Sequence, residues 1–349
     1  MSEFRRRLMM SALRPTPPYP DPWVDDGWIW AYYDVTTTES ATTLIYDNLS
    51  YLGATFIIDG VEVARTASYT FDTVGEHLVK MQCSGAVRAN TFRVSRLVRI
   101  YFPDTVTGIG EACFLNDANL SHVWLPDTIT TITNRAFEGC SSLRVINVDN
   151  TSITTVNGSS NYGTFRYCTS LRKLHFPVTV TSFEQRSVQG CSSLIDVNLS
   201  DLTSLVSIGA LAFGSDTKLR GTWKAPSTFT TLGNQSFAST KLEEVDLGDS
   251  SVTTIPGSTN FGCFQACSVL SKVILPDTTT TLQQRAFYQC YALATVICKA
   301  TTPPTISGQS LPGTSYVQHI YVPAESVEDY KAASGWSSYA SKIEAIPTT

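Results

Sequence analysis

Nine cysteines and four histidines are the side chains of this 349-residue sequence that could support thiol, metal or acid–base chemistry. No cysteine pair has the C-x₂-C spacing of a structural zinc site, and an odd number of cysteines argues against a complete disulfide framework. None of the histidines (His77, His122, His175 and His319) lies in a recognisable nucleophile or metal motif. No glycine-rich phosphate loop follows a strand. The sequence therefore predicts neither an enzyme nor a cofactor or metal site.

Most of the cysteines instead occupy fixed places in a repeating pattern. Five of them lie three residues before a regularly spaced leucine: Cys140, Cys168, Cys191, Cys267 and Cys290. A second series consists of phenylalanines at one place in each unit: Phe114, Phe137, Phe165, Phe213, Phe237, Phe264 and Phe287. Cysteine and phenylalanine are often fully buried, so the fixed positions predict two parallel ladders of side chains in the core.

The regularly spaced leucines define the units: Leu97, Leu120, Leu143, Leu171, Leu194, Leu219, Leu242, Leu270 and Leu293. The steps between them are 23, 23, 28, 23, 25, 23, 28 and 23 residues. A period in the twenties with one strand-like run per unit is typical of a solenoid, here with its strands stacked into a parallel sheet. Units that are 99 residues apart correspond, which indicates a duplicated block of four units. The two long units share a five-residue insertion (28 − 23), around residues 157–162 and 256–261, and we expect two similar bulges on one face.

The repeat consists of an apolar residue, Pro-Asp-Thr, a threonine-rich run, then Ala-Phe, Cys and Leu, as in residues 125–143 and 275–293 and, with Pro-Val-Thr and Ser-Val at two of these places, in residues 176–194. This pattern resembles the BspA-type leucine-rich repeats of bacterial surface proteins, over about 250 of the 349 residues. The run 320–346 is similar to the segment that closes such arrays. The resemblance implies a leucine-rich-repeat β-solenoid. It also implies an adhesin or interaction scaffold, although a fold does not determine a function.

Four segments are expected along the chain. Residues 1–30 read as an extended attachment arm, 31–92 as a small Ig-like β domain, 93–312 as the solenoid and 313–349 as a C-terminal cap. The Ig-like expectation depends on short strand-like runs and on Asp59-Gly60, a strong hairpin signal. The cap should contain a short helix that begins at Pro323 and ends near Gly335. Its apolar residues Val327, Tyr330 and Trp336 should cover the last repeat.

The arm combines clustered arginines with prolines and has no repeat. Arg5, Arg6 and Arg7 are candidate contacts to neighbouring subunits of a larger assembly. The apolar run of residues 8–13 is shorter than the centre of a secretory signal peptide, so no convincing signal is predicted.

The composition narrows the choice of partners. Charged residues make up 16% of the chain and the formal net charge is −5, which argues against a nucleic-acid surface. No apolar run approaches the ~18 residues of a membrane span.

The repeat frame predicts which side chains point away from the core. Side chains alternate along a strand, so the second and fourth residues after each leucine should face outward. The candidate ligand-binding residues are aromatic or basic members of this set: Arg99, Tyr101, His122, Trp124, Lys173 and His175. Such a patch suits a glycan through ring stacking or an acidic protein surface through charge. The alternative is that Tyr101 and Trp124 are a cross-strand pair that stabilises the sheet by about 0.2–1 kcal/mol.

Two functions are consistent with this reading. The first is recognition or adhesion, with the array binding a protein or glycan on a host surface and the arm attached to a cell surface or a bacteriophage particle. The second is a structural or decoration component of such a particle, without a ligand of its own. Both place the protein at an extracellular surface or on a virion.

Overall fold

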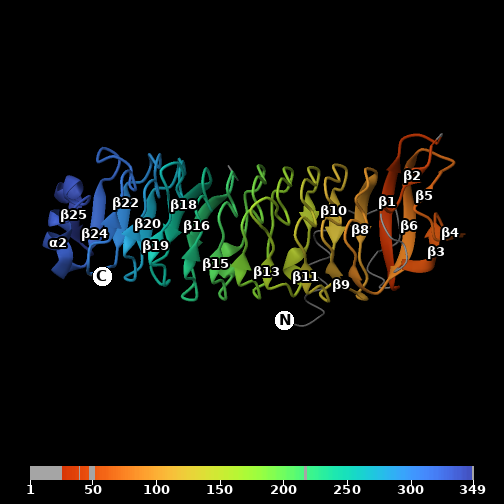
Figure 1. Ribbon diagram of the computed structural model, residues 1–349, viewed down its shortest axis with the longest axis horizontal. Helices are drawn as coiled ribbons and strands as arrows, with labels where there is room; N and C mark the ends of the chain where they lie inside the picture. The colour runs from red at the N-terminus through yellow and green to blue at the C-terminus, as the bar shows by residue number, and fades with distance from the viewer. Residues whose placement is uncertain (1–25, 39, 47–51, 216–217, 348–349) are drawn as a thin grey trace.

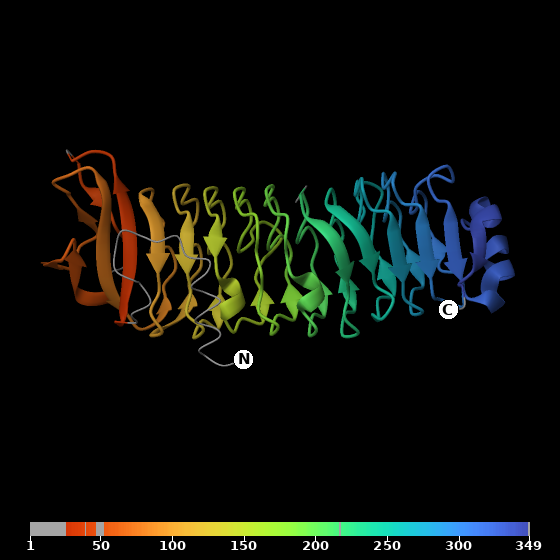
Figure 2. The same ribbon diagram turned by 180° about the vertical axis from the view of Figure 1, so that it is seen from behind.

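The chain forms one elongated array of stacked turns (Figure 1). The structure is a computed structural model that describes residues 26–38, 40–46, 52–215 and 218–347. Most of the expected attachment arm, including Arg5, Arg6 and Arg7, lies outside these residues. Viewed from behind, the array shows the same order of turns from the N-terminal strands to the C-terminal helices (Figure 2).

Two sheets form the face that carries the longer strands. The first has seven strands, in the spatial order β12 (Val145–Ile146), β10 (His122–Trp124), β8 (Leu97–Tyr101), β1 (Trp28–Val35), β6 (Gly75–Cys83), β3 (Leu52–Ile58) and β4 (Val61–Ala64). The second has six, in the order β16 (Arg220–Lys224), β18 (Lys241–Asp246), β20 (Lys272–Leu275), β22 (Thr295–Cys298), β24 (His319–Val322) and β25 (Ile343–Ala345). All neighbours within the second sheet are parallel, as expected for successive turns.

Short parallel strands form a second face. They make three ladders: β7 (Gly85–Val87), β9 (Val106–Ile109) and β11 (Thr131–Ile132); β13 (Thr155–Val156), β14 (Ser182–Phe183), β15 (Ser207–Ile208) and β17 (Thr231–Leu232); and β19 (Thr254–Ile255), β21 (Thr281–Leu282) and β23 (Thr305–Ile306). Threonine hydroxyls next to this face donate to carbonyls one turn earlier, as from Thr128 to Val106 and from Thr179 to Ile153, both at 2.7 Å. Threonine side chains therefore join successive turns along this face.

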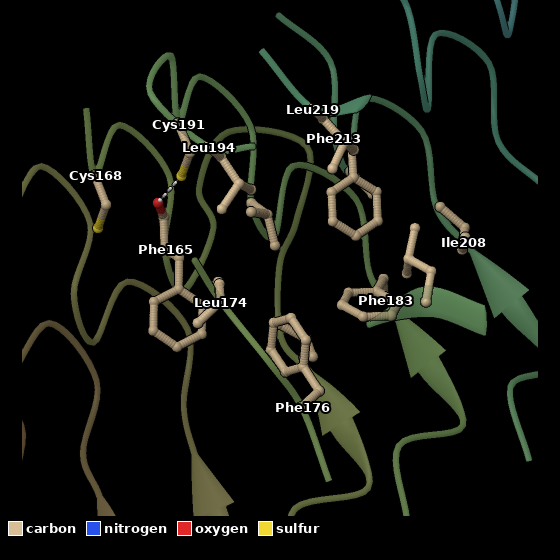
Figure 3. Packing of buried hydrophobic residues seen from close by; sticks show 14 of the residues in the cluster. Phe165, Cys168, Leu174, Phe176, Phe183, Cys191, Leu194, Ile208, Phe213 and Leu219 are labelled. Carbon is tan, nitrogen blue, oxygen red and sulfur yellow. Dashed lines mark hydrogen bonds between the residues drawn. The ribbon is translucent and has the colours of Figure 1, made fainter. Parts of the chain in front are cut away.

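The phenylalanine and cysteine ladders form the core as predicted. All seven ring positions are 0% exposed, and neighbouring rings such as Phe114 and Phe137 stack at 5.0 Å and 6°. Each thiol of the cysteine ladder donates to the carbonyl of a phenylalanine one turn earlier, as from Cys191 to Phe165 at 3.1 Å (Figure 3). All nine cysteines are buried and free, so no disulfide framework exists.

The phenylalanine ladder is interrupted at one turn, where Val188 takes the ring position. Two phenylalanines from the strand faces fill the space: Phe176 lies 6.2 Å from Phe165, and Phe183 lies 5.0 Å from Phe213 (Figure 3). Phe176 and Phe183 themselves meet edge to face at 4.9 Å. The aromatic core is therefore continuous although the repeat is not.

The long-strand face is not one continuous sheet, which corrects the prediction of a single parallel ladder. After β12 the chain turns into a 3₁₀ helix, η2 (Val148–Asn150), and two units later into η3 (Leu199–Asp201). The side-chain amide of Asn147 replaces a strand partner: its Oδ1 accepts from the Leu125 N–H at 2.7 Å and its Nδ2 donates to the Leu125 carbonyl at 2.9 Å. Asn198 pairs with Phe176 in the same way.

The N-terminal strands do not form the expected Ig-like domain. Strand β1 pairs antiparallel with β8, so β1, β6, β3 and β4 extend the first sheet of the array. Only β2 (Thr42–Thr43) and β5 (Ser68–Tyr69) pair separately. The two expected boundaries also shift. Trp28 to Trp30 belong to β1 and not to the arm, and Phe92 stacks on Phe114 at 5.4 Å and thus already belongs to the repeat core.

The C-terminal cap is present as predicted, but its α-helix is shorter than expected and spans only Val327–Ala332 within the predicted run from Pro323 to Gly335. After β24 the chain forms η4 (Ala324–Ser326), α2 (Val327–Ala332) and η5 (Ser337–Lys342) before β25. Tyr330 and Trp336 are 0% exposed, and each donates to a carbonyl of the last turn: Tyr330 to Ala300 at 2.7 Å and Trp336 to Pro304 at 2.8 Å. These contacts cover the apolar end that an open array would expose.

Candidate functional site

Strands β8 and β10 hold the aromatic candidates side by side. Their parallel register pairs Arg99 with His122 and Tyr101 with Trp124. The intervening residues Ile100 and Val123 are 0% exposed, which places the candidates on the outward face because side chains alternate along a strand. The structure therefore places these four residues on the outward face, as predicted from the sequence, and their role in binding stays a prediction.

The side chains of Tyr101, Trp124 and His122 form a row of parallel rings, and this stacking was not predicted from the sequence. Tyr101 and Trp124 stack at 4.2 Å and 4°, and His122 lies parallel to Trp124 at 5.4 Å and 7°. We call Tyr101, Trp124 and His122 the aromatic row; all three are partly exposed. The cross-strand pair of Tyr101 and Trp124, which was the alternative interpretation of these residues, is thus present. Because Tyr101 and Trp124 use one face each on the other, the row offers edges and polar tips more than open ring faces.

Strand β1 extends the same surface with aromatic residues that the sequence analysis missed. Trp30 pairs with Tyr101, and Tyr32 pairs with Arg99. Tyr32 meets Tyr101 edge to face at 5.9 Å. Trp30 and Tyr32 are only 8% and 3% exposed and add little accessible ring area, whereas Trp28 on the same strand is partly exposed. The alternation Trp28, Trp30, Tyr32 was a usable signal, since it marks one face of a strand.

Two of the cations beside the row are already paired. Arg99 bonds to Glu76, and its guanidinium lies 4.7 Å from the Tyr32 ring. Lys80 bonds to Asp26 at 2.6 Å and lies 4.2 Å from the Trp30 ring. These cation–π contacts and ion pairs hold the margin of the patch in place. They also neutralise much of the charge that a purely electrostatic recognition of acidic partners would need.

Two pKa shifts make the aromatic row neutral near neutral pH. Burial lowers the pKa of His122, and the nearby Arg99 and Arg144 lower it further, because both effects disfavour the imidazolium. Burial raises the pKa of the Tyr101 hydroxyl, which Glu76 supports and Arg99 opposes. The row therefore presents a neutral imidazole, an indole and a protonated phenol.

Lys173 and His175 are not part of this patch. They lie one unit beyond β12, where the seven-stranded sheet has ended. The backbone of Lys173 makes an isolated parallel β-bridge with that of Asp196. His175 Nε2 is 3.1 Å from Asp196 Oδ2. The expected cluster of six therefore divides into four neighbouring residues and two separate ones, of which His175 faces the carboxylate of Asp196.

The described part of the chain gives no indication of catalysis. It holds no group of three or more His, Cys, Asp or Glu side chains arranged to bind a metal ion. Burial raises the pKa of the Cys113 thiol to about 12 and that of Cys263 to about 12, which makes them poor nucleophiles. Over the same residues, none of the helices has the length and apolar character needed to span a bilayer.

Comparison with known proteins identifies the repeats. The model of the BspA-type leucine-rich repeat region matches residues 85–220, 158–263 and 258–334, with six copies. These ranges cover more than half of the chain, and the chain belongs to this family. No curated protein matches it.

Similar solved structures are leucine-rich-repeat proteins of bacteria. A leucine-rich cell surface protein from Faecalibacterium prausnitzii A2-165 is 19% identical, with 89% of this chain and 97% of that chain covered and a TM-score of 0.43. A leucine-rich-repeat protein from Bacteroides ovatus is 18% identical, with 80% and 90% covered and a TM-score of 0.29. The leucine-rich-repeat protein of T. pallidum is also 18% identical, with 61% and 76% covered and a TM-score of 0.32.

Proposed function

We propose that the chain is a non-enzymatic recognition protein that binds a protein on another surface through the aromatic row. The observation that carries the proposal is the stack of Tyr101 on Trp124 at 4.2 Å, held partly exposed on the outward face of a rigid sheet. Tyrosine and tryptophan are enriched at the energetic centres of interfaces, and rings fixed by stacking lose little entropy on binding. Membership of the BspA-type repeat family agrees with a binding role.

The geometry favours a protein partner over a sugar at this place. A pyranose ring needs an open aromatic face, whereas each ring here has two ring neighbours. Tyr101 meets Trp124 and Tyr32, and Trp124 meets Tyr101 and His122. The paired state of Arg99 and Lys80 disfavours a partner selected by negative charge alone. We therefore expect binding that persists at about 0.5 M salt, where exposed charge pairs are largely screened.

The proposal places the protein at an extracellular surface or on a bacteriophage particle, anchored through residues 1–30. The support is the sequence of the arm, with Arg5, Arg6 and Arg7 followed by prolines. Removing residues 1–22 should leave the melting temperature nearly unchanged and abolish retention in the parent assembly, measured by co-sedimentation with isolated envelopes or particles. Normal retention of the truncated protein would contradict anchoring through the arm.

The binding test uses the full chain labelled with a fluorophore and a panel of bacterial and eukaryotic cells. Tyr101→Ala with Trp124→Ala should abolish binding. The matched control is Ile274→Ala with Ile297→Ala, a cross-strand pair at the same register of the second sheet. Treating the cells with protease should remove binding, whereas deglycosylation should not.

If the aromatic double variant binds like the parent, the proposed function is wrong for this surface. If the parent binds no cells at all, the decoration role without a ligand is favoured.

A further inference from the structure

Two loops on the second face carry the same exposed aromatic side chain although they belong to different halves of the internal duplication. We call residues 157–163 (NGSSNYG) and 256–262 (PGSTNFG) the twin loops. Tyr162 is 40% exposed and Phe261 is 47% exposed. The two residues before each ring are exposed as well: Ser160 and Asn161 in the first loop, and Thr259 and Asn260 in the second.

The twin loops are built identically. Each is closed by an antiparallel bridge between two glycines, Gly158 with Gly163 and Gly257 with Gly262. In the first loop the Ser159 N–H donates to the Tyr162 carbonyl at 2.8 Å. The second has the same bond from Ser258 to Phe261 at 2.6 Å.

The next turn of the array holds each loop rigidly. The N–H of Gly158 donates to Glu184 at 2.9 Å, and that of Gly257 donates to Gln283, the corresponding residue 99 positions later, at 3.0 Å. A Cβ on either of these glycines would collide with a carbonyl oxygen of the following turn, at Gln185 or Gln284. The loops are therefore pre-organised, which lowers the entropy cost of binding a ligand.

The bonds that close the loops join backbone atoms and do not involve the rings. Other units of the array close without the insertion. Arg135 lies over one face of the Tyr162 ring at 4.1 Å, and this ring is still 40% exposed. Outward residues of the preceding strands have meanwhile diverged, from Val145 in the first block to Glu244 in the second. The loops have thus kept a ring beside hydroxyl and amide groups while their surroundings changed. Tyrosine, serine, glycine and asparagine together are the composition of adaptable binding loops.

The arrangement of the two loops indicates the kind of ligand. They follow β13 and β19, which are separated by four steps of stacked strands (Figure 1), so they lie roughly 19 Å apart at about 4.8 Å per strand. Stacked turns are related by translation along the array and not by a two-fold axis. A ligand that meets both loops in the same way must therefore repeat by translation, as a linear polymer does.

The chemistry of the loops selects among such polymers. Neither loop contains a charged residue, although Arg135 contacts the Tyr162 ring and Arg285 donates to the Asn260 carbonyl at 3.2 Å. The net negative charge of the chain disfavours a polyanion as the preferred ligand. An aromatic ring flanked by hydroxyl and amide groups fits the apolar face and the hydroxyls of a sugar. We propose that the twin loops form two subsites for one neutral linear polysaccharide, separate from the aromatic row.

The test measures binding to soluble mixed-linkage β-glucan, galactomannan, arabinoxylan and dextran, each with a series of oligosaccharides cut from it. The parent should bind at least one of these polymers, and affinity should rise once the fragment is long enough to reach both loops. Tyr162→Ala or Phe261→Ala alone should lower the affinity for the long polymer by about 10-fold or more and remove the dependence on length. The double variant should show no measurable binding, and Tyr162→Phe should bind like the parent.

Two controls keep the outcome unambiguous. Tyr291→Ala removes another exposed ring, 53% accessible, from outside the twin loops and should not change binding. Tyr101→Ala with Trp124→Ala should also leave polysaccharide binding intact, so that failure of one site is distinguished from failure of the other. The proposal is overturned if no polymer binds the parent, if the double loop variant binds equally well, or if affinity does not depend on length.

Discussion

The thiol of Cys168 donates a 3.1 Å hydrogen bond to the carbonyl oxygen of Phe137, one turn earlier in the array. The ring of Phe137 in turn stacks on that of Phe165 at 5.5 Å and 3°. Turns that carry both a ladder phenylalanine and a ladder cysteine are therefore joined to the previous turn by a ring stack and by a thiol–carbonyl bond. This pairing of two ladders gives the array a rigid core without disulfides, and it supports the surfaces on which recognition is proposed.

Phe137→Ala should lower the free energy of unfolding by about 3–5 kcal/mol, because it leaves a cavity between two stacked rings. Equilibrium urea unfolding measures the change. Phe261→Ala is the matched control, since its ring is exposed, and it should stay within about 0.5 kcal/mol of the parent. A loss below about 1 kcal/mol for Phe137→Ala would show that the ladder does not carry core packing.

Val188→Phe should destabilise the protein even though it restores the repeat pattern. The rings of Phe176 and Phe183 already fill the space at this turn, so an added ring overpacks the core at a cost of about 1–3 kcal/mol. Thermal unfolding followed by circular dichroism checks the sign. A rise in melting temperature would mean that the turn contains unfilled volume.

Asn147→Ala should cost about 1–3 kcal/mol, because it leaves the N–H and the carbonyl of Leu125 without their side-chain partner. Asn147→Asp keeps an acceptor for the N–H but places a carboxylate against the carbonyl, so it should not rescue stability at neutral pH. Chemical denaturation of both variants makes the comparison. Equal stability of parent and Asn147→Ala would contradict the role of the amide as a strand substitute.

Asp117 should make stability fall as pH rises. It is 1% exposed, and burial raises its pKa to about 8 while bonds from the N–H groups of Asn119 and Leu120 act in the opposite direction. Between its ordinary pKa of 3.8 and about 8, the folded state binds more protons than the unfolded state. The free energy of unfolding therefore decreases with increasing pH across this window.

Asp117→Asn removes this titration and should stabilise the protein relative to the parent at about pH 9 more than at about pH 5. Urea unfolding across the range gives the two slopes. Parallel pH profiles for the variant and the parent would show that Asp117 ionises normally in the fold.

Deleting residues 320–349 should cause aggregation, because it removes Tyr330 and Trp336 from the end of the core and exposes the edge of β22. Size-exclusion chromatography with light scattering is the measurement. A soluble monomer with an unchanged melting temperature would show that the cap is dispensable.

The repeat core and the cap could be predicted from sequence because their signals are local and periodic. A cysteine or phenylalanine that recurs at the same place in most units is expected to contact its copies in neighbouring turns, and Tyr330 and Trp336 follow the last unit closely. The outward position of Tyr101 and Trp124 follows from alternation along a strand. The sequence shows that Val188 replaces a ladder phenylalanine. It does not show that Phe176 and Phe183 fill the space left by the missing ring, because this depends on packing between residues of different faces.

The N-terminal region could not be placed from sequence. A hairpin signal such as Asp59-Gly60 shows that two strands pair, but it does not show which sheet they join. Strand β1 pairs with β8 across more than sixty residues and in the antiparallel sense, which the parallel repeat gives no reason to expect. The stacking of Trp124 on Tyr101 likewise depends on side-chain rotamers, and the separation of His175 from the patch depends on where the sheet ends.

Hydroxyl-radical footprinting of the labelled chain on the cells that it binds tests the recognition role most directly. Oxidation of Tyr101 and Trp124 should fall on binding. Tyr46, which is 62% exposed and lies outside the aromatic row, should react as in the free protein. Unchanged oxidation of both Tyr101 and Trp124 on cells that retain the protein would contradict it.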